Sequence, residues 1–189
     1  MKLDPKKTAV LTLDIQEGIL GFAPGAAATA IPNAGKVAEA ARKGGYLLMH
    51  VGIGFEPGYP EISVDSPRFT RIKERGGFIK GTESAKTHRE VFKPGDLVLY
   101  KNRTSAFSGS PLELILRSQG IKALVLMGIA TSGIVLSTLR QASDLDYPCI
   151  VVKDACYDPD EEVHRVLTEK VFASQATVVT TQAFLAEFA

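Results

Sequence analysis

Gly128-Ile129-Ala130-Thr131-Ser132-Gly133-Ile134-Val135 is the stretch from which the fold of this chain can be worked out. It follows the apolar run 123–127, which is typical of a buried parallel strand, and it leads into apolar residues at helical spacing as far as Leu145. Unpaired N–H groups at such a helix start can hold an oxygen that gains negative charge. An ordinary strand-to-helix turn, with small residues for close packing, is the alternative interpretation.

Outward from this stretch, apolar runs and helical patterns alternate along the whole chain. The runs predict strands over 8–13, 46–51, 96–101, 122–127, 148–152 and 176–179. This alternation predicts an α/β fold with a doubly wound, mostly parallel sheet of about six strands and helices on both faces. A length of 189 residues suits one domain over 1–189.

Composition and charge exclude several classes of function. The net charge of +1 provides no basic surface for nucleic acid, and no apolar run is long enough to span a membrane. No apolar signal segment precedes the first predicted strand, so we expect a cytoplasmic protein. Cys149 and Cys156 are expected to be reduced and mostly buried, and no metal-ligand spacing is present. We therefore expect neither a metal nor a cofactor.

Polar residues stand where the predicted strands end. Asp14 follows strand 8–13 and Lys101 ends strand 96–101, so both are expected at the sheet edge that carries the turn at 131–134. His50 lies inside an apolar strand and is predicted to be a hydrogen-bonded core residue. His164 stands among charged residues of a predicted helix and is expected to be exposed.

Residues 52–95 form the longest irregular stretch, which is typical of a lid or pocket wall unless it contains short elements. Its aromatic residues either pack the segment down or line a pocket. The charged patch from Arg68 to Arg75 is most simply a solvated face, with anion binding by Arg68 or Arg71 as the alternative.

Four motifs along the chain are similar to those of one family. Asp14-Ile15-Gln16 looks like its D-x-Q element, and residues 101–112 are similar to its K-x-x-x-S-A-F-x-G-T/S-x-L element. Residues 128–133 are similar to its third element, and Asp154-Ala155-Cys156 with Glu162-x-His164 fits the closing segment. The chain thus resembles the isochorismatase-like hydrolases, also called cysteine hydrolases, over nearly its whole length.

The resemblance implies a Rossmann-like sheet and a catalytic Asp-Lys-Cys set. Asp14 and Lys101 match the first two members, but Ile134 stands where the cysteine nucleophile of the amidase members is expected. The metal-binding D-x-H pattern of nicotinamidases is also missing after strand 46–51. True isochorismatases lack the cysteine, and in them an aspartate protonates a vinyl ether and water completes the cleavage. Asp14 is predicted to act in this way.

The resemblance also implies a binding site around these residues. A non-proline cis peptide bond is expected at Ala130–Thr131, with backbone N–H groups of Thr131 and Ile134 forming an oxyanion hole. Gln16, Phe107, Arg68 and Arg71 are the candidate substrate-binding residues, and a small molecule is the expected substrate. A homo-oligomer, either a dimer or a tetramer, is expected from the resemblance alone.

Three functions stay open from the sequence. The first is a hydrolase of a small polar metabolite, with a vinyl ether or amide-like bond, that uses Asp14 and Lys101 without a cysteine at position 134. The second is a hydrolase with a substitute nucleophile, for which Ser132 and Cys156 are nearest in sequence. The third is a catalytically degenerate member that binds a ligand or a partner protein.

Overall fold

A six-stranded parallel sheet forms the centre of the computed structural model, which describes residues 3–187. The spatial order is β3-β2-β1-β4-β5-β6, and every neighbouring pair runs parallel, which confirms the predicted doubly wound sheet. The strands are β1 (Thr8–Leu13), β2 (Leu47–Ile53), β3 (Leu97–Lys101), β4 (Ala123–Gly128), β5 (Cys149–Val152) and β6 (Ala176–Val179).

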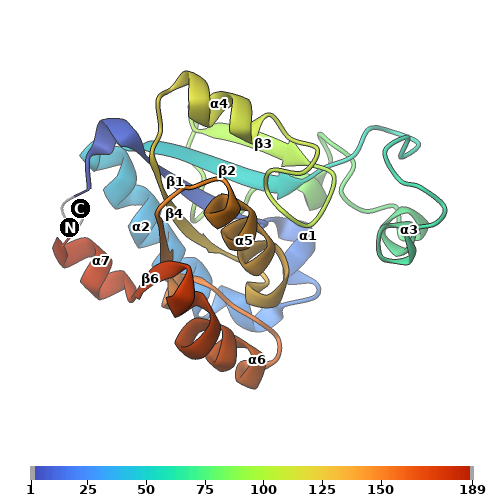
Figure 1. Cartoon of the computed structure of the whole chain (residues 1–189). Coiled ribbons are helices and arrows are strands. Elements are labelled where there is room, and N and C mark those ends of the chain that lie inside the picture. Colours follow the sequence, from blue (N-terminus) through green and yellow to red (C-terminus); the bar gives the residue numbers. More distant parts are fainter. Residues whose placement is uncertain (1–2, 188–189) are drawn as a thin grey trace.

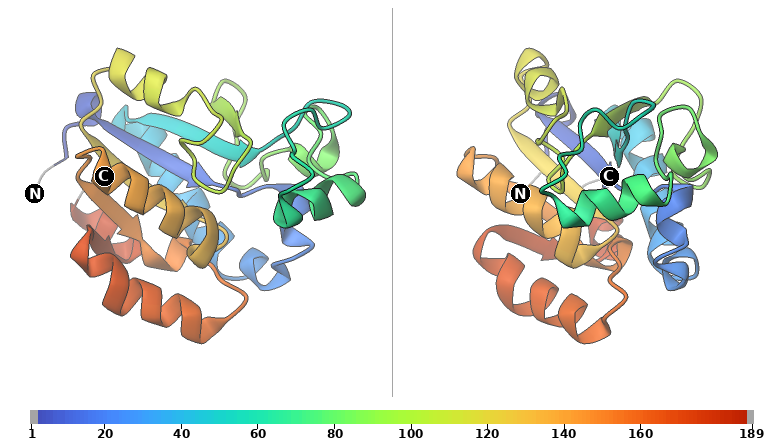
Figure 2. Two further views of the ribbon diagram at one scale, coloured as in Figure 1. Left: turned by 45° about the vertical axis from the view of Figure 1, so that its right-hand side comes forward. Right: turned by 90° about the vertical axis from the view of Figure 1, so that its right-hand side faces the viewer.

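Helices cover both faces of the sheet. Helices α2 and α7 lie on one face, and α4, α5 and α6 lie on the other (Figures 1 and 2). The α-helices are α1 (Glu17–Leu20), α2 (Ala30–Gly44), α3 (Pro67–Glu74), α4 (Leu112–Ser118), α5 (Leu136–Asp144), α6 (Glu161–Val166) and α7 (Thr181–Glu187). None of the helices described within residues 3–187 is long and apolar enough to cross a membrane.

Shorter helical turns link these elements. The 3-10 turns are η1 (Pro5–Lys7), η2 (Pro24–Ala27), η3 (Glu83–Ala85), η5 (Lys153–Ala155) and η7 (Phe172–Ser174), and the π-helical turns are η4 (Thr131–Val135) and η6 (Leu167–Val171).

Apolar residues at the expected spacings form the core. All six residues of β1 are buried, as expected for a central parallel strand covered on both faces. Helix α2 buries a stripe from Ala30 to Ala41 and is followed by Gly45, whose φ of 73° suits a glycine just after the end of a helix.

The order of the strands places a crevice at their carboxyl ends. Chain connectivity reverses direction between β1 and β4, and in such sheets ligands bind beyond the strand ends at this point. Leu13, the last residue of β1, pairs with Val51 on one side and Gly128 on the other. Asp14 and the turn after β4 therefore start at the same edge.

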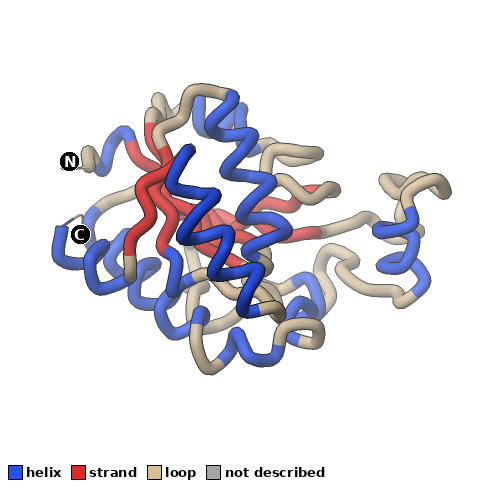
Figure 3. The backbone as a smooth tube through the Cα atoms, turned by 60° about the horizontal axis from the view of Figure 1, so that its bottom comes forward, coloured by secondary structure: helices blue, strands red, loops and turns tan. Residues whose placement is uncertain are grey.

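Residues 54–82 form an arm that extends beyond this edge (Figures 1 and 3). The arm contains α3, and η3 follows it, so the stretch 52–95 does contain short elements. It has a small core of its own, separate from the main core, formed with the last residue of β2. The buried residues of this second core are Ile53, Phe55, Tyr59, Ile62, Phe69 and Phe78.

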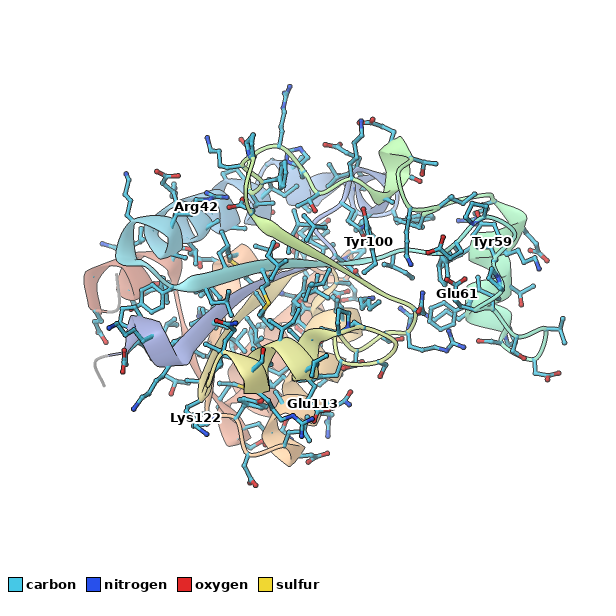
Figure 4. The ribbon with its side chains drawn as sticks, turned by 90° about the horizontal axis from the view of Figure 1, so that it is seen from above. Arg42, Tyr59, Glu61, Tyr100, Glu113 and Lys122 are labelled. Atoms are coloured by element: carbon cyan, nitrogen blue, oxygen red, sulfur yellow. The ribbon has the colours of Figure 1, made fainter. Side chains whose placement is uncertain are left out.

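A buried polar network ties three strands to α2. His50 lies between Thr12 Oγ1, 2.6 Å from its Nδ1, and Asp96 Oδ2, 3.0 Å from its Nε2. Arg42 extends from α2 toward the start of β3 (Figure 4) and pairs with Asp96 at 2.6 Å. Burial lowers the pKa of His50, although Asp96 acts in the opposite direction. The prediction of a hydrogen-bonded core histidine is confirmed.

Candidate active site

The carboxyl ends of β1 and β3 bring Asp14 and Lys101 together. Asp14 directly follows β1, Lys101 ends β3, and β2 lies between these two strands. Lys101 Nζ lies 3.0 Å from Asp14 Oδ2 and donates to the Arg103 carbonyl oxygen at 2.9 Å. The lysine side chain is 2% exposed, so it spans the end of β2 inside the protein. The predicted pair is therefore a buried ion pair.

Burial and the neighbouring cations shift the pKa of Asp14 in opposite directions. Burial raises its pKa above the ordinary 3.8, although the charge and hydrogen bond of Lys101 and the charge of Arg68 act in the opposite direction. Oδ2 faces Lys101, whereas the buried Oδ1 has no hydrogen-bond partner within residues 3–187. Buried polar atoms normally have a partner. Asp14 thus lines the cavity with a carboxyl group that has one oxygen paired to Lys101 and one buried oxygen without a partner.

The turn after β4 differs from the predicted one. The π-helical turn η4 precedes α5, which begins at Leu136. The cis peptide bond joins Ile129 to Ala130, so the predicted position at Ala130–Thr131 was wrong by one residue. The strand also runs one residue further than predicted, because β4 ends at Gly128 and the Ile129 N–H still donates to the Leu13 carbonyl oxygen at 3.0 Å.

Thr131 does not offer its N–H group to the cavity. This N–H donates to the Tyr157 carbonyl oxygen at 2.9 Å, and Thr131 is completely buried. The predicted oxyanion role of the Thr131 N–H is therefore wrong, because the segment after β5 already provides its acceptor. Ala130 and Ile134 do line the cavity, so the backbone of Ile134 stays the predicted oxyanion donor.

A second polar cluster supports the turn from behind. His164 Nδ1 lies 2.8 Å from Thr131 Oγ1, and Asp158 Oδ2 accepts a hydrogen bond from the Ser132 N–H at 2.8 Å. His164 is partly buried rather than exposed, and burial lowers its pKa although the Asp158 charge acts in the opposite direction. The expectation of an exposed His164 was wrong because the start of α6 packs against η4.

Neither substitute nucleophile reaches the cavity. Ile134 lines it and is 2% exposed, whereas Ser132 and Cys156 are absent from its walls. Burial raises the pKa of Cys156 to about 12, which keeps the thiol protonated and unreactive at neutral pH. The geometry therefore argues against a covalent mechanism through either residue.

The cavity has a volume of about 570 Å³, which is within the range of small-molecule sites. Asp14, Lys101 and the turn after β4 line one side, and α1 and the arm line the other. The residues that line it are Asp14, Gly18, Ile19, Phe22, Ala23, Ile53, Arg68, Phe69, Arg71, Ile72, Arg75, Gly77, Phe78, Ser84, Lys101, Arg103, Thr104, Ile129, Ala130, Gly133, Ile134 and Pro159.

Arg68 and Arg71 therefore lie at the site, whereas Gln16 and Phe107 do not line it. The Gln16 amide donates to the carbonyl oxygens of Ile53 and Ala85 at 2.9 and 2.8 Å and accepts from the Ile53 N–H at 2.9 Å. Phe107 is 7% exposed and belongs to the main core. Both predicted substrate-binding residues instead hold the framework together.

Metal ligands do not gather in the part of the chain that the structure describes. Within residues 3–187 there is no group of three His, Cys, Asp or Glu side chains that could hold a metal ion. The expectation that neither a metal nor a cofactor takes part stays a prediction.

Sequence comparison assigns this arrangement to a known family. A profile of the isochorismatase domain matches residues 8–183. The chain belongs to the isochorismatase family. It is 31% identical over 190 residues to the uncharacterized isochorismatase family protein YecD of Escherichia coli O157:H7, with 98% of each chain covered.

Solved structures agree with the isochorismatase-family assignment. N-carbamoylsarcosine amidase from Thermoplasma acidophilum is 28% identical, with a TM-score of 0.74 over 93% of this chain and 96% of that one. A cysteine hydrolase from Pseudomonas syringae pv. phaseolicola 1448A has a TM-score of 0.88 at 16% identity, over 99% of this chain and 94% of that one. The second likeness shows the fold alone.

Several residues of this isochorismatase-family site escaped the sequence reasoning. Phe22, Arg75 and Arg103 line the cavity, yet none of them was a predicted site residue. Arg75 follows Arg68 by seven residues, a spacing that places both on one face of a helix. Arg103 occupies an unspecified position of the K-x-x-x-S-A-F element, and Phe22 follows α1 outside every motif, so no residue type marks either position.

Proposed function

We propose that this isochorismatase-family protein hydrolyses a small polar metabolite, with Asp14 as proton donor and acceptor and Lys101 as its partner. One observation carries the proposal. The ion pair at 3.0 Å lies at the wall of a cavity of about 570 Å³, and Asp14 Oδ1 has no partner within residues 3–187. A titratable group with a raised pKa beside a specific charge partner in a cavity is typical of a catalytic acid or base.

The chemistry we propose needs no covalent intermediate. The Asp14 carboxyl group, when protonated, donates its proton to the substrate, at the double bond of a vinyl ether or at the leaving nitrogen of an amide-like bond. Water then adds its oxygen to the electron-poor carbon and returns a proton to Asp14, which restores the acid and gives a hemiketal or tetrahedral intermediate. This intermediate collapses to a carbonyl group: the C–O or C–N bond breaks, and an alcohol leaves with the hydroxyl proton or an amine leaves with the proton it already holds. Lys101 stabilises the carboxylate that exists between these two proton transfers.

Ile134 favours this mechanism over the amidase mechanism. An isoleucine side chain has neither a nucleophile nor a proton to transfer, and in this chain it occupies the cavity wall at the position where the resemblance predicts the cysteine. The backbone N–H of Ile134 does not depend on the side chain. It stays the candidate donor to a developing oxyanion.

The same isoleucine supports a second candidate function. A family member that has lost catalysis would keep the cavity as a binding site for a small molecule or a partner protein, and loss of the nucleophile explains Ile134 directly. The two functions differ in one outcome: a binding protein is stabilised by its ligand but converts none.

Asp14→Asn is the variant that tests the catalytic proposal. The natural protein is incubated with a panel of small vinyl ethers and carboxamides, and products are followed by NMR spectroscopy. For any substrate that is converted, we expect kcat to fall at least about 100-fold in Asp14→Asn, because a general acid contributes roughly 10²–10⁴ in rate. Iodoacetamide treatment should leave turnover intact.

Asp144→Asn is the matched control, because Asp144 lies exposed on α5 and outside the cavity. It should keep the full rate. Turnover by Asp14→Asn at the natural rate would refute the acid–base role, and a panel without any turnover would favour the binding function.

A further inference from the structure

The arm presents a row of arginines to the cavity. Arg68, Arg71 and Arg75 follow one another at helical spacing from α3 into its last turn, and all three line the cavity. Arg103 and Lys101 add two more cations from the opposite side. Among the described residues that line the cavity, Asp14 is the one acidic side chain. The site therefore carries a large excess of positive charge although the chain as a whole has a net charge of only +1.

Three of these cations already have partners. Lys101 is paired with Asp14, and the Arg75 guanidinium lies over the Phe22 ring at 5.3 Å. Arg103 lies over the Phe69 ring at 5.2 Å and donates to backbone carbonyl oxygens at both ends of its guanidinium. These contacts fix the three side chains in the framework of the site.

Arg68 and Arg71 differ from the other cations. Neither side chain has a hydrogen bond, an ion pair or a ring contact within residues 3–187, and Arg68 acts by its charge on Asp14. The Arg68 guanidinium reaches across to the turn after β4. If Gly133 in this turn carried a Cβ atom, that atom would lie 3.8 Å from a terminal nitrogen of Arg68. Arg68 and Arg71 are both exposed and line the cavity, so the donors of two guanidinium groups meet solvent there rather than protein acceptors.

The position of these two arginines is set by contacts of the arm with the body. Arg103 donates to the Glu61 carbonyl oxygen at 3.0 Å, and the Asn102 amide donates to the Gly54 carbonyl oxygen at 2.8 Å. Glu61 lies on the arm beyond the end of β3 (Figure 4). Phe69 is buried in the core of the arm between Arg68 and Arg71. The helix that carries the arginines is therefore anchored at the mouth of the cavity.

Apolar side chains line the cavity as well as the arginines and the ion pair. Ile19, Phe22, Ile72, Phe78 and Ile134 line the cavity. A fully solvated ion would leave these side chains without contact, whereas a molecule with an apolar body would cover them.

From this arrangement we infer that the site takes a small carboxylate with an apolar body, and that Arg68 and Arg71 bind its carboxylate group. Guanidinium groups bind carboxylates through paired N–H···O bonds, and free donors of this kind favour an anion over its neutral analogue. The bond to be cleaved then lies at the other end of the molecule, beside Asp14 and Lys101. This inference names the substrate class for the hydrolase proposed above and rests on it.

Binding of benzoate and benzamide tests the inference without any need for turnover. The two probes have the same ring and nearly the same shape, but only benzoate is an anion. Affinities are measured by NMR titration of the natural protein, Arg68→Gln, Arg71→Gln and the control Lys73→Gln. Lys73 lies exposed on the same helix and does not line the cavity.

We expect the natural protein and Lys73→Gln to bind benzoate at least about tenfold more tightly than benzamide, and each arginine variant to lose most of this preference. Equal affinities in the natural protein, absence of binding by both probes, or an unchanged preference in both arginine variants would overturn the inference. Tighter binding of phenylphosphonate than of benzoate would overturn the carboxylate assignment in favour of a phosphate-type anion.

The same titration on Asp14→Asn separates this inference from the catalytic proposal. Preference for benzoate should persist in Asp14→Asn because the arginines are unchanged. If the natural protein prefers benzoate but Asp14→Asn still converts substrates, the catalytic role of Asp14 is wrong. The anion site formed by the two arginines is then still supported.

Discussion

Ile134 is the residue at which this chain departs most from the cysteine hydrolases it resembles. Its side chain lines the cavity but is only 2% exposed, and the floor of the site holds the Asp14–Lys101 pair. The natural thiols are elsewhere. Cys149 and Cys156 are buried, and burial raises the pKa of each to about 12. Thiol chemistry at the cavity therefore requires a cysteine that the chain does not have.

Ile134→Cys should create a single reactive thiol. We expect the native variant to gain one carbamidomethyl group from iodoacetamide at neutral pH, measured by intact-protein mass spectrometry and assigned by peptide mapping. The native natural protein should gain none, because both of its thiols are protonated and shielded. Both proteins should react at Cys149 and Cys156 once unfolded in urea. Rapid modification of the folded natural protein would contradict this description of the two cysteines.

At the scale of elements, side chains that lie next to the strands hold the strand ends and strand starts in place. The Gln16 amide holds the end of β2 against η3, and the Asp14–Lys101 pair spans β2. At the start of β3, Asp96 accepts hydrogen bonds from Arg42 and from the Lys93 N–H, and it contacts His50. These contacts join segments far apart in sequence, so they set how the strand ends meet at the site.

His50 makes the stability of this arrangement depend on pH. Its pKa is lowered from 6.5 in the folded state by burial, against the opposing effect of Asp96 and together with the charge of Arg42. The unfolded chain therefore binds more protons than the folded one as pH falls below about 6.5, and the free energy of unfolding decreases with falling pH. His164 titrates in the same sense because its pKa is also lowered.

His50→Gln should lower the free energy of unfolding at pH 7.5 by about 1–3 kcal/mol, through loss of the contacts with Thr12 and Asp96. Between pH 7 and pH 5 its free energy of unfolding should also decrease less than that of the natural protein. The proton taken up by His50 contributes at most about 1.4 kcal/mol per pH unit to this decrease. Urea unfolding at several pH values measures both quantities. An identical pH slope in the two proteins would contradict the role of His50.

At the scale of the whole molecule, the protein consists of a sheet with one main core and an arm with a small core of its own. The cavity lies between the two, so the position of the arm determines its shape. Arg103 is a link between them, through the Glu61 carbonyl oxygen and the Phe69 ring. A homo-oligomer, expected from the resemblance, stays a prediction that light scattering after gel filtration would test.

Arg103→Ala should loosen the arm without unfolding the sheet. The variant lacks the contacts of Arg103 with the Glu61 carbonyl oxygen and the Phe69 ring, so the arm should open more easily. We expect amides in residues 54–82 to exchange with deuterium about tenfold faster, while the amides of β1 and β4 keep their protection. Hydrogen–deuterium exchange with mass spectrometry measures this. Arg117→Ala is the control, since Arg117 lies exposed on α4 and pairs with Glu113 of the same helix. Equal acceleration in the arm and in the sheet would show that Arg103 supports global stability instead.

The sequence by itself determined the architecture and the central pair. Continuous apolar runs predict buried parallel strands because both of their faces must be covered, and the residues that follow such strands meet at one edge whatever the loops do. Asp14 and Lys101 could be found for this reason. Gln16 and Phe107 stand in motifs as well, but the sequence does not show whether the side chain of a motif residue faces a ligand or the protein core.

Tertiary structure alone decided the walls of the site. The Thr131 N–H is used by Tyr157, His164 turns inward to Thr131, and Arg75 and Arg103 reach the cavity from the arm and from the end of β3. Each of these outcomes depends on contacts between segments separated by many residues, and local propensity carries no information about such contacts. The charged residues of α3 are exposed, as predicted for a solvated face, and only the fold of the arm places Arg68 and Arg71 at the cavity as well.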